Sequence, residues 1–316
     1  MPEPQAQMRA VLAQLALGRQ GSPHRYTLPF PQARAQLLKE REPWLDDGPA
    51  CHTIDLTAQA QDRRVGLRVT QPVRKPSNQL LIYLHGGGWC VGSPQTHDNI
   101  VRRLATEMGC DAWSIDYALA PEATFPQGLF DVLAIISYAQ QEHPTCHLTL
   151  AGDSAGANLA FAATLLELRN KGATSVDGLL LFYGVYADTY DDASMTEFGD
   201  GRFGLSLQAQ QRYLQAYLGE AQPDFPYVQE RECSFPLTSG VALHGLPPVW
   251  MTIAELDILR DQNRALAGQL RQHGVEVHVD EVPGVTHGFL SYGRMLDAAS
   301  HTLSAAAQWE RARVRR

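Results

Sequence analysis

A serine in a glycine-flanked turn is the first residue of this sequence whose surroundings point to chemistry. Ser154 lies in the motif Gly-Asp-Ser-Ala-Gly at 152–156, after the apolar run 148–151 and before a segment with helical spacing. A serine held in a tight strand-to-helix turn presents its hydroxyl as a nucleophile, and small flanking residues let the turn close. The helix N-terminus at the same place favours an oxyanion. The motif alone also occurs as a purely structural turn, so the hypothesis depends on partner residues elsewhere.

Three consecutive glycines form the second chemically suggestive stretch. They belong to His-Gly-Gly-Gly-Trp at 85–89, directly after the apolar run 80–84. Glycine amides are unshielded and can approach the oxyanion of a tetrahedral intermediate. We expect the oxyanion hole to consist of the N–H groups of Gly86, Gly87 and Ala155. A phosphate cradle is the alternative, but the stretch matches neither G-x-G-x-x-G nor a P-loop with its lysine.

A serine nucleophile needs a histidine base, and the histidine needs a carboxylate that fixes its orientation. In strand-turn-helix hydrolases the acid and then the histidine follow the serine along the chain. Asp257 comes shortly after the apolar run 249–253, where active-site groups of open sheets gather, and is the expected acid; Glu255 is the second choice. His287 follows the run 275–279 in a loop with small neighbours and is the expected base.

Other polar residues near these motifs have structural interpretations. His85 precedes the glycine loop, and we expect it to order that loop through hydrogen bonds. Asp261 is interpreted as the N-cap of a helix over 261–272. Cys90 is expected to be a packed small residue. Three further histidines are assigned to a turn, a helix end and a strand: His244, His273 and His278.

The elements that must position these residues alternate along the chain. Short apolar runs predict strands that are covered on both faces, at 80–84, 112–115, 148–151, 178–183, 249–253 and 275–279. Helical spacing predicts helices over 128–141, 158–168 and 261–272. This alternation predicts an α/β fold with a doubly wound, mostly parallel central sheet and helices on both faces.

Two regions interrupt the alternation. Residues 1–50 look mainly helical, and residues 185–235 form a long polar and aromatic excursion. We predict that these regions are the two segments of a mainly helical cap, which covers one edge of a core made of 51–184 and 236–316. A surface insertion that only adds bulk is the alternative for the second segment.

Composition narrows the class of protein. The chain has 316 residues, of which 44% are hydrophobic, as is typical of a globular enzyme, and its net charge of −8 argues against nucleic acid or an anionic membrane as a partner. Its five scattered cysteines form no C-x-x-C pair, which argues against a disulfide framework or a zinc site. Without a signal peptide or a membrane-spanning apolar run, we expect a cytoplasmic protein.

Taken together, the motifs resemble the hormone-sensitive-lipase-like branch of the α/β-hydrolases, and most of all its bacterial acetyl esterases. Besides the glycine loop and the serine motif, the resemblance rests on Asp-Tyr-Ala-Leu-Ala-Pro-Glu at 116–122, Phe-Pro at 125–126, Asp-Ile-Leu-Arg-Asp at 257–261 and His-Gly-Phe at 287–289. Ala118 stands where the family often has arginine, which puts a local salt bridge in question but not activity.

The resemblance implies an α/β-hydrolase fold and a carboxylic ester hydrolase with a Ser154–His287–Asp257 triad. It also implies that neither a metal nor an organic cofactor takes part. The expected partner is a small ester with a short acyl chain; a homo-oligomer is left open. An amidase or peptidase with the same triad is one alternative, and a non-catalytic ligand-binding or regulatory homologue is another.

Three aromatic residues are candidates for the wall of a small acyl pocket. Trp89 adjoins the glycine loop, and Phe203 and Tyr213 belong to the second cap segment. For any one of them, packing of the cap onto the core is an equally good interpretation.

Overall fold

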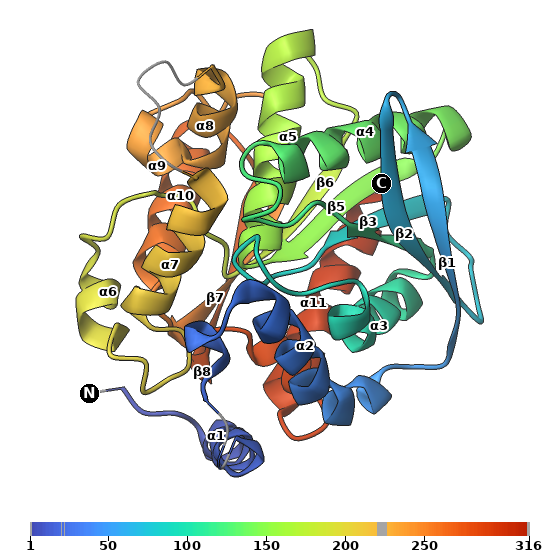
Figure 1. Cartoon of the computed structure of the whole chain (residues 1–316). Coiled ribbons are helices and arrows are strands. Elements are labelled where there is room, and N and C mark those ends of the chain that lie inside the picture. Colours follow the sequence, from blue (N-terminus) through green and yellow to red (C-terminus); the bar gives the residue numbers. More distant parts are fainter. Residues whose placement is uncertain (1, 20, 22, 220–225, 315–316) are drawn as a thin grey trace.

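An eight-stranded sheet runs through the centre of the computed structural model, which describes residues 2–19, 21, 23–219 and 226–314 (Figure 1). Its strands are β1 (Cys51–Ala60), β2 (Arg63–Pro72), β3 (Gln79–Leu84), β4 (Asp111–Asp116), β5 (His147–Asp153), β6 (Gly178–Phe182), β7 (Val249–Leu256) and β8 (Val277–Thr286). Their order across the sheet is β1-β2-β4-β3-β5-β6-β7-β8. Strands β3 to β8 run parallel to one another, whereas β2 is antiparallel to both of its neighbours.

Helices cover both faces of this sheet (Figure 1). One face carries α4 (Gln127–Glu142), α5 (Ala155–Lys171) and α10 (Arg260–Gln272); the other carries α3 (Asp98–Met108) and α11 (Asp297–Val314). Each face of the sheet forms a hydrophobic core with its helices, and successive residues of β3 point to opposite cores. Leu80 and Ile82 pack against the first set of helices, and Leu81 and Tyr83 pack against the second. This alternation explains why the central strands are apolar along their whole length.

The six predicted strands, the three predicted helices and the mostly parallel doubly wound sheet are confirmed. The β1–β2 hairpin was not predicted from the sequence. Strand β1 lies at the edge of the sheet, where Ile54 and Leu56 are exposed. The sequence did carry a signal for this strand, because Ile54, Leu56, Ala58 and Ala60 alternate with polar residues. The prediction rested on continuous apolar runs, and this alternating pattern was not used.

The two regions outside the alternating pattern are mainly helical and contact each other. The N-terminal region holds α1 (Ala6–Gly18), α2 (Phe30–Arg41) and two short 3-10 helices, Arg25–Thr27 and Glu42–Asp47. The second region, 185–235, holds α6 (Ala193–Phe198), α7 (Leu207–Leu218) and α8 (Val228–Ser234), and α9 (Pro236–Ser239) follows just beyond it. Arg212 of α7 donates to the Tyr26 carbonyl oxygen at 2.5 Å and to that of Leu28. Its guanidinium also lies 4.2 Å from the ring centre of Phe30.

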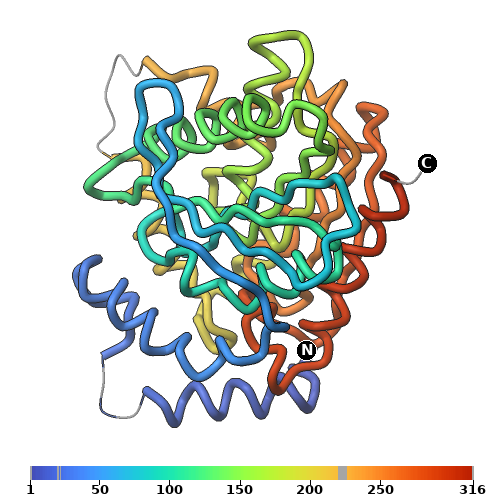
Figure 2. Tube along the Cα trace, turned by 90° about the vertical axis from the view of Figure 1, so that its right-hand side faces the viewer, coloured from blue at the N-terminus to red at the C-terminus, as the bar shows by residue number. Residues whose placement is uncertain are grey.

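Helix α1 lies along one end of the molecule, beside the C-terminal part of the chain (Figure 2). The Gln7 side chain donates to Asp297 at 2.9 Å, and the Gln5 N–H donates to the Gly284 carbonyl of β8 at 2.9 Å. The N-terminal region is thus fixed next to the strand that leads to His287. A short 3-10 helix, Phe289–Tyr292, follows that residue. Within the described ranges, no helix is both long and apolar enough to cross a membrane.

Candidate active site

Ser154 connects β5 to α5 in a strained backbone conformation. Its φ of 55° and ψ of −120° lie in a region that residues with side chains rarely adopt. A Cβ atom on Gly156 would stand 1.9 Å from the Leu84 carbonyl oxygen, and one on Gly152 would stand 2.5 Å from the backbone of Gly156. The turn therefore closes only with glycine at both positions, and it leaves the serine at the carboxyl end of β5.

Ser154, His287 and Asp257 form one hydrogen-bonded chain. Ser154 Oγ lies 2.9 Å from His287 Nε2, and His287 Nδ1 lies 2.7 Å from Asp257 Oδ2. The Asp257 side chain is buried, and its Oδ1 accepts the N–H of Leu259 at 3.0 Å. A carboxylate fixed in this way holds the imidazole with Nδ1–H toward itself and leaves Nε2 able to take the serine proton.

Three parallel strands bring this chain together. Ser154 follows β5, Asp257 follows β7 and His287 follows β8, so all three stand at the carboxyl edge of the sheet. The ring of Tyr183, just after β6, lies 5.1 Å from the His287 ring at an interplanar angle of 64°. This edge-on contact limits the orientations open to the imidazole.

Two carboxylates near the expected acid have other partners. Glu255 accepts the N–H of Gly284 at 2.7 Å, which ties β7 to β8. Asp261 lies inside the first turn of α10, whose N-cap is Leu259, so its interpretation as that N-cap is wrong. The Asp261 carboxylate instead accepts the N–H of Ser194 at 2.8 Å, at the start of α6.

The glycine loop differs in one donor from the predicted oxyanion hole. The Gly86 N–H donates to Asp153 Oδ1 at 2.9 Å, so it is engaged inside the protein and is not free for a substrate oxygen. In the described part of the chain, the N–H groups of Gly87, Gly88 and Ala155 have no acceptor. The loop donors that remain available are therefore those of Gly87 and Gly88, whereas the sequence analysis named Gly86 and Gly87. Residue type and spacing do not distinguish the three glycines.

Asp153 is a buried residue that holds two parts of the site together, a role that the sequence analysis did not predict. Its carboxylate accepts the Tyr83 hydroxyl at 2.8 Å and the Gly86 N–H, and His97 Nε2 lies 3.4 Å away. Burial alone would raise the pKa of Asp153, but His97 and the hydrogen bonds from Tyr83 and Gly86 hold this pKa below its ordinary value. The charged carboxylate thereby joins the nucleophile turn to the glycine loop. The available signal was an acidic residue directly before the serine.

His85 and Cys90 have the structural positions that the sequence suggested. His85 is buried, its Nδ1 lies 2.8 Å from the Gly86 carbonyl oxygen, and its ring stacks on Tyr117 at 4.3 Å. Burial lowers the pKa of His85 to about 3, so its ring is neutral near pH 7. Cys90 is fully buried, and burial raises the pKa of its thiol to about 12.

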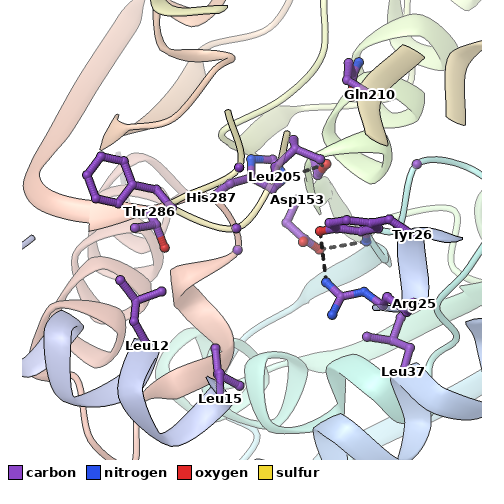
Figure 3. Close-up of a pocket in the computed structure, with 18 of the residues that line it drawn as sticks. Leu12, Leu15, Arg25, Tyr26, Leu37, Asp153, Leu205, Gln210, Thr286 and His287 are labelled. Carbon is purple, nitrogen blue, oxygen red and sulfur yellow. Dashed lines mark hydrogen bonds between the residues drawn. The ribbon is translucent and has the colours of Figure 1, made fainter. Parts of the chain in front are cut away.

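A cavity of about 250 Å³ opens onto Ser154 (Figure 3). Its wall combines the glycine loop, the His287 loop, the N-terminal region and residues 201–205 of the second region. Leu12 and Leu15 of α1 line one side, next to Thr286 (Figure 3). Both predicted cap segments thus border the same cavity. No group of three or more His, Cys, Asp or Glu side chains that could hold a metal ion occurs in the ranges described.

The three candidate pocket aromatics divide into two groups. Phe203 and Tyr213 line the cavity, as the sequence suggested. Trp89 does not: only 1% of it is exposed, and its ring stacks on Tyr217 at 4.3 Å with an interplanar angle of 4°. Its Nε1 also donates to Asn158 at 3.3 Å. Trp89 therefore packs the glycine loop onto α5 and α7, and its prediction as a pocket wall is wrong.

Comparison with known proteins supports the assignment of the fold. The sequence profile of the alpha/beta hydrolase fold family matches residues 81–291. The chain is 34% identical to the acetyl esterases of Salmonella schwarzengrund and Salmonella typhi over 290 residues, which are 89% of this chain and 87% of theirs.

Solved structures of esterases superpose on nearly the whole chain. An ester hydrolase from the metagenome of Lake Arreo gives a TM-score of 0.89 at 28% identity, covering 99% of this chain and 100% of that one. A hyperthermophilic esterase from the archaeon Pyrobaculum calidifontis gives 0.86 at 26% identity, covering 99% of both chains. With the serine turn, the glycine loop and the chain order of acid and base all in place, the protein belongs to the α/β-hydrolase fold family, in its hormone-sensitive-lipase-like branch.

Proposed function

We propose that the protein is a carboxylic ester hydrolase that cleaves short-chain acyl esters, acetyl esters above all, with Ser154 as nucleophile. One observation carries the proposal: the hydrogen-bonded chain from Ser154 through His287 to buried Asp257, which ends in a cavity. The activity of the Salmonella relatives, which are named acetyl esterases, supports the choice of ester.

In the first half of the reaction, Ser154 Oγ attacks the ester carbonyl while His287 Nε2 takes the serine proton. Asp257 stabilises the resulting imidazolium. His287 then protonates the leaving oxygen, so the alcohol departs and the acyl group stays on the serine. In the second half, His287 removes a proton from water, the hydroxide attacks the acyl carbonyl, and Ser154 recovers its proton as the acid leaves.

The oxyanion of each tetrahedral intermediate is assigned to the N–H groups of Gly87, Gly88 and Ala155. These three groups have no acceptor among the described residues, and Gly87 and Gly88 line the cavity. The helix N-terminus at Ala155 adds its dipole to the same stabilisation. Loss of a single donor of this kind typically costs about 3–4 kcal/mol of transition-state stabilisation.

Cavity size supports short acyl chains. Small-molecule sites usually measure about 300–1,000 Å³, and this cavity is below that range at about 250 Å³. Phe203 and Tyr213 contribute to its wall. The two helical regions, 1–50 and 185–235, are proposed to act together as the cap that sets this limit over the core of 51–184 and 236–316.

Covalent labelling tests the proposal directly. A fluorophosphonate probe should attach to Ser154 in the wild-type protein and leave Ser154→Ala unlabelled, and nitrophenyl acetate should give a burst of nitrophenol. Labelling without turnover of any ester would favour a binding homologue over an enzyme. Faster cleavage of anilides than of matched esters would favour an amidase.

We also propose that the protein is cytoplasmic and that its partners are small molecules. The five cysteines are all free, and three of them (Cys90, Cys110 and Cys233) are buried, as suits a reducing cytoplasm. The net charge of −8 argues against nucleic acid or an anionic membrane as a partner, which leaves small molecules as the expected partners.

A further inference from the structure

One arginine in the cavity wall carries a charge without a partner. Arg41, the last residue of α2, lines the same cavity as Ser154 and His287. Its Nε and Nη1 are buried and have no hydrogen-bond partner, and no carboxylate of the described residues forms an ion pair with it. Its guanidinium lies 5.3 Å from the ring centre of Tyr292, a contact that supports the cation but supplies no acceptor. A partly buried guanidinium with unpaired N–H groups and no counter-charge is unfavourable, and an anion in the cavity would stabilise it.

The rest of the cavity wall does not neutralise this charge. Each of the other lining arginines has its own partner: Arg25 Nη1 lies 2.5 Å from Glu40 Oε2, Arg202 Nη1 lies 2.7 Å from Asp200 Oδ2, and Arg19 Nε lies 3.0 Å from the Leu15 carbonyl oxygen.

The one acidic residue among the described cavity-lining residues is Asp153, and Tyr83 and Gly86 already donate to its carboxylate. Four arginines and one carboxylate thus line the cavity, so the charge of its wall is positive, although the whole chain carries a net charge of −8. Such a local field favours an anionic ligand over a neutral one of the same shape.

Arg41 stands on the side of the site from which the alcohol leaves. Its Nη2 lies 4.0 Å from the position of a Cβ on Gly288, the residue directly after His287. His287 must deliver a proton to the leaving oxygen, so the alcohol portion of the ester lies on the His287 side of the scissile bond. A negative group on the alcohol portion is therefore placed near the guanidinium.

We infer that Arg41 binds a carboxylate on the alcohol portion of the substrate, so that the preferred substrates are short-chain acyl esters of hydroxy acids. The carboxylate accepts a charge-assisted hydrogen bond from Nη2 and balances the unpaired charge of the partly buried guanidinium. This inference rests on the proposed ester hydrolysis and adds the class of alcohol to it.

Matched substrates test the inference. The kcat/KM for 4-acetoxybutanoate should exceed that for the neutral 4-acetoxybutanamide by about 10- to 100-fold, the range of one hydrogen bond to a charged group. In Arg41→Gln this ratio should fall to near one, and in Arg41→Lys it should stay above one, because the charge remains. A ratio of two rate constants from the same variant cancels any general loss of activity or of folded protein.

Arg202→Gln is the matched control, since it removes a cavity-lining arginine that already pairs with Asp200. Its substrate ratio should stay at the wild-type value. The inference is overturned if wild type shows no preference for 4-acetoxybutanoate, if Arg41→Gln keeps the preference, or if the preferred carboxylate lies on the acyl portion, as in monoethyl succinate. If wild-type protein cleaves no ester and Ser154 takes no fluorophosphonate, the proposed function itself fails.

Discussion

Asp153 Oδ1 accepts the N–H of Gly86 at 2.9 Å, and this bond joins the residue before the nucleophile to the loop of the oxyanion hole. The Tyr83 hydroxyl donates to the same oxygen, in the buried layer beneath the loop. One carboxylate therefore fixes the position of the nucleophile turn relative to the glycine loop. The effects of losing this carboxylate on the reaction rate and on the stability of the protein can be measured separately.

Asp153→Asn should lower kcat by about 10- to 100-fold with a smaller change in KM, because the loop donors lose their alignment with the transition state. The free energy of unfolding should also fall by about 1–3 kcal/mol, as expected for loss of a buried charged acceptor. Steady-state kinetics and urea unfolding at pH 7 measure the two effects. Equal kcat in the variant and wild type would show that the loop keeps its position without this carboxylate.

The Asp153 carboxylate also determines how the stability of the protein should depend on pH. Its folded-state pKa lies below the ordinary 3.8, so its contribution to stability is complete above that pH and is lost as pH falls further. The difference in Tm between wild type and Asp153→Asn should therefore be constant from pH 7 to about 5 and shrink only in stronger acid. A difference that disappears already at pH 5 would contradict the assignment of a charged Asp153.

Ser154→Ala should lower kcat for nitrophenyl acetate by several orders of magnitude, on the scale of 10⁴ to 10⁶. The strained φ of 55° is retained by alanine at a similar cost, so the variant should unfold at nearly the wild-type urea concentration. Circular dichroism and urea unfolding serve as the control for folding. Turnover within tenfold of wild type would remove Ser154 from the mechanism.

The sequence allowed the core of the fold and the expected triad to be predicted, because both depend on short-range signals. Strand-like runs end directly before Ser154 and shortly before Asp257, and the chain order of serine, acid and histidine singles out His287. Edge strand β1 gave a different signal: from Thr53 to Ala60 polar and apolar residues alternate, as in a strand with one buried face, and it shows no continuous apolar run.

Assignments that depend on side-chain direction were not predictable in this way. Nothing in a run of three glycines shows which N–H turns toward Asp153, and nothing in the sequence near Trp89 shows that its ring stacks on Tyr217. Arg41 is similar: its surroundings come from a cation–π contact with Tyr292, far along the chain. Long-range packing decides such roles, and local sequence does not record it.

His85 should make the protein less stable in mild acid. Its folded-state pKa is about 3, against 6.5 for an ordinary histidine, so between these values the unfolded chain binds a proton that the folded chain does not. Stability should fall as pH falls from 6.5, with His85 adding a slope of up to about 1.4 kcal/mol per pH unit. Urea unfolding of wild type and His85→Gln at pH 7, 5.5 and 4.5 measures this share. Parallel curves for the two proteins would show that His85 titrates normally.

Phe203 should help to set the limit on acyl length. It is a partly buried cavity residue, and its ring packs against Phe198 at 5.9 Å without contacting the triad. Phe203→Ala should enlarge the cavity, so that it holds about two more methylene groups of the acyl chain. Each buried methylene contributes about 0.8 kcal/mol, so the ratio of kcat/KM for nitrophenyl decanoate to kcat/KM for nitrophenyl acetate should rise by about tenfold. Trp89→Phe is the matched control, because Trp89 faces the core, and its ratio should stay at the wild-type value. An unchanged ratio in Phe203→Ala would place the limit elsewhere in the wall, with Tyr213 as the next residue to shorten.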